Sequence, residues 1–142
     1  MSGLLHHLIE ASARRHGRGA ALAFRDTVLD YAALAERVAA AAAGFAGLGL
    51  RRGERLAIYL EKRIETVAAM FGAAAAGGVY VPINPLLKPR QVGYILRDCN
   101  VRILVTSRQR FADLVEEIGQ SADLRTVILV DGTTEAVGDK AV

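Results

Sequence analysis

Short apolar runs alternate with segments of helical periodicity between residues 56 and 130. Each run has the length of a buried strand, and the runs cover 56–60, 79–83, 103–106 and 127–130. Apolar residues recur at spacings of three and four in the intervening segments 64–75, 88–98 and 111–118. Because parallel strands need a crossover that is usually a helix, this order predicts an α/β fold. We expect a mostly parallel sheet with helices on both faces.

The first 50 residues predict an N-terminal helix, a small hairpin and a long helix. The first helix ends near Gly17, has Ser2 as a possible N-cap, and carries an apolar face of Leu4, Leu5, Leu8, Ile9 and Ala11. Two short apolar segments, 21–24 and 28–29, flank a turn and predict the hairpin. Asp30 can then cap the long helix, whose apolar face consists of Tyr31, Leu34, Val38, Ala42, Phe45 and Leu48.

The segment 77–85 joins a helix to a strand and then to a proline turn. Gly77 and Gly78 can end the helix, because glycine adopts a left-handed C-terminal cap without a Cβ clash. The apolar residues 79–81 predict a buried strand. Pro82 and Pro85 stop that strand, since proline has no amide hydrogen to donate to a neighbouring strand.

Composition indicates one globular domain. Of the 142 residues, 52% are hydrophobic, and the net charge of +3 is scattered without a basic, aromatic stripe, which disfavours nucleic-acid binding. We expect a domain over 1–131 and a connector or frayed tail over 132–142. The single cysteine, Cys99, suits a reducing cytoplasm. No segment reads as a signal peptide or a membrane span, so we expect a soluble, cytoplasmic chain.

Sequence patterns that approach catalytic or ligand-binding signatures are incomplete. The glycines of 47–53 follow a helix and precede a strand, whereas a phosphate-binding loop needs the reverse order. Residues 131–134 resemble the start of a phosphate loop, but Glu135 follows in place of further glycines. The three histidines lie within the first 16 residues, where no carboxylate or thiol is placed to complete a metal shell. We predict no catalytic residue and no metal ligand.

Four motifs in register resemble the N-terminal domain of AMP-forming acyl-CoA synthetases, the adenylate-forming ligases. Residues 29–34 resemble the family's first core motif, in which Tyr-x-x-Leu opens a helix. Residues 52–58 resemble its Gly-Asp-Arg-Val strand entry, with Glu54 in place of the usual aspartate. The string 77–84 resembles its helix, strand and proline turn, and the later strands follow in order. The resemblance covers essentially the whole chain and implies part of such an N-terminal domain.

The resemblance implies a two-step reaction that activates a carboxylic acid. The acid reacts with Mg-ATP to give an acyl-adenylate and pyrophosphate, and coenzyme A (CoA) then displaces AMP to give a thioester. In the family, a Ser/Thr/Gly-rich loop with a lysine holds the ATP phosphates, and the catalytic lysine lies in a separate C-terminal domain. Neither has a counterpart here. We therefore expect the leading part of a longer enzyme, inactive alone, that binds ATP, Mg and CoA without high affinity and partners the remainder of its own chain.

Lys88 and Arg90 are the residues for which the resemblance implies a ligand contact. They follow the proline turn, which in some CoA ligases approaches the nucleotide end of CoA, and two cations can pair with its phosphates. Leu86 stands where the family often has a basic residue. The alternative is that both cations are simply exposed at a helix start.

Two other interpretations stay open from the residues. A stand-alone, non-catalytic α/β interaction or regulatory module would be monodisperse with a sharp melting transition, whereas a fragment would expose a sheet edge. A flavodoxin-like ligand-binding domain needs a glycine-rich loop from a strand to a helix, and no loop here has that order.

Overall fold

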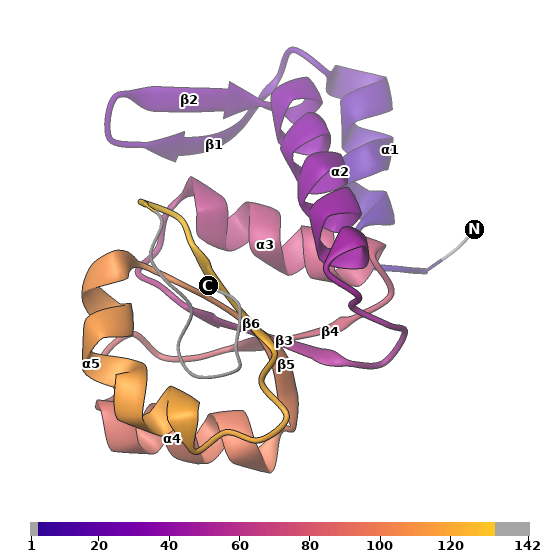
Figure 1. The fold of residues 1–142 in the computed structure, drawn as a ribbon. Helices are drawn as coiled ribbons and strands as arrows, with labels where there is room; N and C mark the ends of the chain where they lie inside the picture. The colour runs from indigo at the N-terminus through magenta and orange to yellow at the C-terminus, as the bar shows by residue number, and fades with distance from the viewer. Residues whose placement is uncertain (1–2, 133–142) are drawn as a thin grey trace.

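A computed structural model describes residues 3–132 of the chain (Figure 1). Its helices and strands follow the alternating order that the apolar runs predict. They are α1 (His7–His16), β1 (Ala20–Phe24), β2 (Thr27–Asp30), α2 (Tyr31–Gly47), β3 (Arg55–Tyr59), α3 (Ile64–Ala75), β4 (Val79–Pro82), α4 (Pro89–Asp98), β5 (Val101–Thr106), α5 (Arg108–Gly119) and β6 (Thr126–Leu129).

Four strands form a parallel sheet in the order β4-β3-β5-β6, and all three pairings are parallel. The chain moves from β3 to β4 on one side and then returns to place β5 on the other side of β3. The direction of winding therefore reverses between β3 and β5. The predicted parallel sheet is confirmed.

Helices cover both faces of this sheet, as Figure 1 shows for α3 on one side and for α4 and α5 on the other. The alternation of β3 explains the two layers, because successive side chains point to opposite faces. Leu56 and Ile58 pack in one core cluster with residues of α2 and α3. Ala57 and Tyr59 pack in another with residues of α4 and α5. Both faces are thus buried, which accounts for the continuous apolar run.

The N-terminal elements form a smaller unit beside the sheet. β1 and β2 pair antiparallel, which confirms the predicted hairpin. The first helix, however, begins at His7 rather than near Ser2, which lies outside the described residues. Leu4 and Leu5 accept hydrogen bonds in tight turns before the helix, from His7 N and Leu8 N. Of the predicted apolar face only Ile9 is buried, because α2 covers a single side of α1.

Glycine and aspartate set the helix ends as the sequence predicts. Asp30 Oδ1 accepts a hydrogen bond of 2.8 Å from Ala33 N and caps α2. Gly77 has a φ of 84°, and its amide donates to Ala74 O while the amide of Gly78 donates to Ala73 O. This paired arrangement is the Schellman motif, which satisfies the last carbonyls of α3 and turns the chain into β4.

Besides those of the first helix, three side chains that the sequence places inward are exposed. Val79 is 48% exposed, because β4 lies at an edge of the described sheet rather than in its centre. Pro82 is the last residue of β4 and is tolerated there because an edge strand has one side free of ladder hydrogen bonds. Leu48 and Val115, on the predicted faces of α2 and α5, are also exposed.

Two further predictions concern membranes and the tail. Among residues 3–132, no helix combines the length and the apolar character that a membrane crossing requires. Gly132 is the last described residue, so most of the predicted connector or tail, 133–142, lies outside the described residues.

Candidate functional site

The carboxyl ends of β3, β5 and β6 meet at one edge of the sheet, where ligands bind in open parallel sheets. The point at which the strand order reverses, here between β3 and β5, is the usual position of such a site. A polar cavity of about 370 Å³ opens at this edge. Its walls are Tyr59, Glu61, Arg63, Pro89, Ser107, Gln109, Arg110, Asp113 and Asp131.

Arg110, in the first turn of α5, connects three parts of this edge. Its Nη1 donates to Pro85 O at 2.9 Å, and its Nε lies 3.5 Å from Glu61 Oε2. The guanidinium carbon lies 4.6 Å from the centroid of the Tyr59 ring. Cation–π contact, ion pairing and hydrogen bonding thus act on one side chain, which fixes its orientation.

Glu61 and Arg63 extend the charge network into the start of α3. Arg63 lies 3.3 Å from Glu61 and 2.9 Å from Glu65. The pKa of Glu61 lies below its ordinary value, mainly because the carboxylate accepts a hydrogen bond from its own backbone. Partial burial raises this pKa, whereas the charges of Arg110 and Arg63 lower it further. The hydrogen bond from Arg63 likewise lowers the pKa of Glu65. Both carboxyls are therefore ionised at neutral pH.

Ser107 and Asp131 cap the N-terminus of α5. Ser107 Oγ accepts from Arg110 N at 3.3 Å, and Asp131 Oδ1 accepts from Arg108 N at 2.7 Å. Asp131 begins the tetrapeptide that resembles a phosphate loop, and its carboxylate serves instead as a helix cap. Thr133 and Thr134, the rest of that tetrapeptide, lie outside the described residues.

The walls of the cavity carry a slight net negative charge. Three carboxylates, those of Glu61, Asp113 and Asp131, face two guanidinium groups, those of Arg63 and Arg110. Both arginines already pair with Glu61. A net negative charge with both arginines paired disfavours the binding of a triphosphate at these walls.

The turn segment, residues 84–88, is hydrogen-bonded to two residues of the cavity wall, Tyr59 and Arg110. Tyr59 Oη donates to Leu87 O at 2.6 Å, and Arg110 holds the carbonyl of Pro85. Asn84 Oδ1 accepts from Leu86 N at 2.9 Å. The backbone is therefore held from β3 and α5 as well as from within, while the Leu86 side chain projects outward and is 87% exposed.

Lys88 and Arg90, the two predicted CoA contacts, lie together in the start of α4. Both are exposed, and neither forms an ion pair within the described part of the chain. They border a polar groove whose opposite wall, on α5, includes Asp113, Glu116 and Glu117. Glu117 is itself paired with Arg97 at 2.8 Å. The groove therefore has mixed charge, with the two cations on its α4 side.

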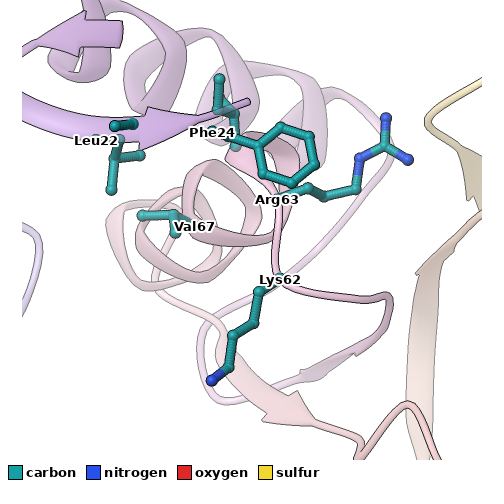
Figure 2. A pocket seen from close by; sticks show the side chains of 7 residues that line it. Leu22, Phe24, Lys62, Arg63 and Val67 are labelled. Carbon is teal, nitrogen blue, oxygen red and sulfur yellow. The ribbon is translucent and has the colours of Figure 1, made fainter. Parts of the chain in front are cut away.

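A small apolar pocket between β1 and α3 is a feature that sequence reasoning missed. Figure 2 shows Leu22 and Phe24 on the hairpin side and Val67 on the helix, with Lys62 extending away from them. Its volume is about 210 Å³. No local sequence pattern predicts this pocket, because its walls come from elements about 40 residues apart in the chain.

The histidines do not gather with other ligands. The rings of His6 and His7 lie with centroids 4.2 Å apart, since His6 precedes the helix that His7 begins. Across residues 3–132, no group of three or more His, Cys, Asp or Glu side chains is placed to hold a metal ion.

A sequence model described as AMP-binding enzyme matches residues 9–141, which is nearly the whole chain. The chain belongs to this family. It is 32% identical over 130 residues to the AMB antimetabolite synthetase AmbB of Pseudomonas aeruginosa, covering 85% of this chain and 10% of that protein. It is 37% identical over 102 residues to the crotonobetaine/carnitine–CoA ligase of Salmonella paratyphi A, covering 70% of this chain and 20% of the ligase.

Solved structures of ligases share the fold. The anthranilate CoA ligase AuaEII, in complex with anthranoyl-AMP, matches with a TM-score of 0.81 and 30% identity, covering 88% of this chain and 25% of that one. The N-terminal domain of FACL13 from Mycobacterium tuberculosis matches with a TM-score of 0.82 at 23% identity, over 91% and 34% of the two chains, which supports the fold alone.

These comparisons confirm the resemblance to adenylate-forming ligases and the α/β fold of their N-terminal domains. The chain spans a tenth to a fifth of the length of the two relatives named above. In this AMP-binding family member, the described residues therefore correspond to a small part of each of these relatives.

Proposed function

We infer that this AMP-binding chain is the N-terminal part of an ATP-dependent acyl-CoA synthetase. The whole enzyme would convert a carboxylic acid, ATP and CoA into acyl-CoA, AMP and pyrophosphate through an acyl-adenylate. The observation that carries this proposal is the similarity, at 37% and 30% identity, to two proteins named as CoA ligases. Its partner would be the remainder of the same enzyme. The single thiol of Cys99 supports a cytoplasmic location.

The proposed role of this part is structural support, without catalysis of its own. At the sheet edge where a ligand would bind, both arginines already pair with Glu61, and the net charge of the lining is negative. Such walls can position neighbouring polypeptide but are unsuited to hold ATP alone. ATP, Mg and CoA would therefore bind tightly only to the longer enzyme.

A test of the catalytic claim uses the purified 142-residue chain. We expect no acid-dependent exchange of labelled pyrophosphate into ATP with a panel of aliphatic, aromatic and amino acids, because the walls described above repel a triphosphate. A ligase of the same family serves as the positive control. Clear exchange by this chain would show that it carries the adenylation chemistry itself.

Lys88 and Arg90 are proposed to contact CoA phosphates. Their exposure, their lack of ion pairs in the described residues and their position at the N-terminus of α4, where Lys88 is the N-cap residue, support this role. Titration of the isotope-labelled chain with CoA at millimolar concentration should shift the amide signals of residues 86–90. The double variant Lys88→Ala/Arg90→Ala should lose these shifts. Arg14→Ala/Arg15→Ala, another exposed basic pair, should keep them. Equal shifts in all three proteins would refute the assignment.

A further inference from the structure

Two side chains from outside the turn segment donate hydrogen bonds to its backbone. The two carbonyl groups that accept them flank the most exposed side chain of the segment. Pro85 O accepts from Arg110 and Leu87 O accepts from Tyr59, at 2.9 and 2.6 Å. Between these carbonyls, Leu86 is 87% exposed. Asn84 also accepts hydrogen bonds from the amides of Leu86 and Leu87, and the Leu87 side chain packs against the core. The two outside donors add the hydrogen bonds that join the segment to β3 and to α5, and a loop that loses such bonds opens more often.

Arg110 is itself fixed by groups that do not belong to the turn segment. Its guanidinium stacks over Tyr59 and pairs with Glu61, both at the carboxyl end of β3. Its backbone lies in the first turn of α5 and donates to Ser107, which caps the helix. Arg110 therefore links the Pro85 carbonyl both to the sheet and to α5.

We propose that Arg110 is a positioning residue that holds the turn segment and thereby sets where Lys88 and Arg90 stand. This inference rests on the proposed function, because the role it assigns to Arg110 is to present two cations to CoA phosphates. Arg110 does not border the groove that Lys88 and Arg90 line. It acts on that groove through the backbone of residues 85–88.

The planar guanidinium is required for this arrangement. It donates an N–H to the Pro85 carbonyl, places Nε 3.5 Å from Glu61 Oε2 as an ion pair and presents a flat face to the Tyr59 ring at the same time. A lysine ammonium carries the same charge but cannot meet all three partners, because its donors radiate from one atom. Arg110→Lys thus separates the effect of charge from that of geometry.

The test measures hydrogen exchange of the 142-residue chain by NMR. In Arg110→Gln and Arg110→Lys, we expect the amides of Leu86, Leu87 and Lys88 to exchange about tenfold faster than in the wild type, because the segment loses a charge-assisted anchor. The amide of Leu104, in the centre of the sheet, should be unaffected. Arg97→Gln is the matched control, since it removes an arginine and its 2.8 Å ion pair with Glu117.

CoA titration completes the experiment. If the wild type binds, the Arg110 variants should bind about tenfold more weakly than the wild type does. Unchanged exchange at residues 86–88 would overturn the inference. Equal acceleration in the Arg97 control would also overturn it, as would a CoA affinity in the Arg110 variants equal to that of the wild type. If the wild type shows no CoA-dependent shift, the proposed CoA contact fails, while the exchange rates still decide whether Arg110 holds the segment.

Discussion

Thr106 is a polar side chain in the middle of the core. It is fully buried at the end of β5, and its Oγ1 donates to Tyr59 O on β3 at 2.8 Å. The bond ties together the two strands between which the winding reverses, directly behind the polar cavity. Tyr59 in turn stacks on Arg110 and donates to Leu87 O, so one buried hydroxyl supports the base of the network at the sheet edge.

Replacing Thr106 by valine keeps the shape and removes the donor. We expect Thr106→Val to lower the free energy of unfolding by about 1 to 2 kcal/mol, because the Tyr59 carbonyl loses a partner in a site that water does not reach. Urea denaturation measures this change. Thr66→Val is the control, since the Thr66 hydroxyl donates to Glu61 O in an exposed bond that water can replace. Equal losses in the two variants would contradict the burial argument.

At the scale of elements, α2 and α3 cross closely because Gly72 has no side chain. A Cβ at Gly72 would lie 2.7 Å from the Ala41 Cβ and 3.3 Å from the Ala42 amide nitrogen. Small residues on both helices permit this approach, which explains the many alanines of the two segments. Their role is packing of the layer that covers one face of the sheet.

A matched pair of glycine substitutions tests this crossing. We expect Gly72→Ala to destabilise the chain by about 1 to 2 kcal/mol, because the added methyl forces the helices apart by more than alanine's helix propensity offsets. In Gly44→Ala, on the neighbouring helix α2, the same methyl meets no atom within 4 Å. That variant should gain up to about 1 kcal/mol. Thermal denaturation measures the melting temperature of both variants, and a shift of the same sign in both would refute the close crossing.

At the scale of the whole molecule, the described sheet has two edges without a further neighbour, β4 and β6. An apolar groove beside β4 is lined in part by Leu4, Leu5, Val79 and Tyr80. An uncovered edge with apolar neighbours favours pairing with another chain. This exposure is what the fragment hypothesis expects and what a stand-alone module would avoid.

Sedimentation of the purified chain separates these hypotheses. We expect concentration-dependent self-association that Val79→Lys weakens about tenfold, since lysines brought together at an edge repel each other. Val115→Lys introduces the same charge at an exposed apolar position on α5 and should leave association unchanged. A monodisperse wild type with a sharp melting transition would instead favour the stand-alone module.

The features that local chemistry controls were predictable from the sequence. The left-handed conformation of Gly77, the Asp30 cap and the alternation of strands and helices depend on residues within a few positions of one another. Lys88 and Arg90 were also correctly placed at the start of α4. Their contact with CoA stays a prediction.

The polar network and the edge position of β4 could be identified only from the tertiary structure. Arg110 meets Pro85 across 25 residues, Tyr59 meets Leu87 across 28, and Thr106 meets Tyr59 across 47. No periodicity or turn preference records such pairs, because they depend on which strands become neighbours. Helix caps and apolar periodicity depend on residues within one turn or one strand, so the residue types of a short segment determine them. The strand order decides which charges meet, since it alone brings the carboxyl ends of β3, β5 and β6 together.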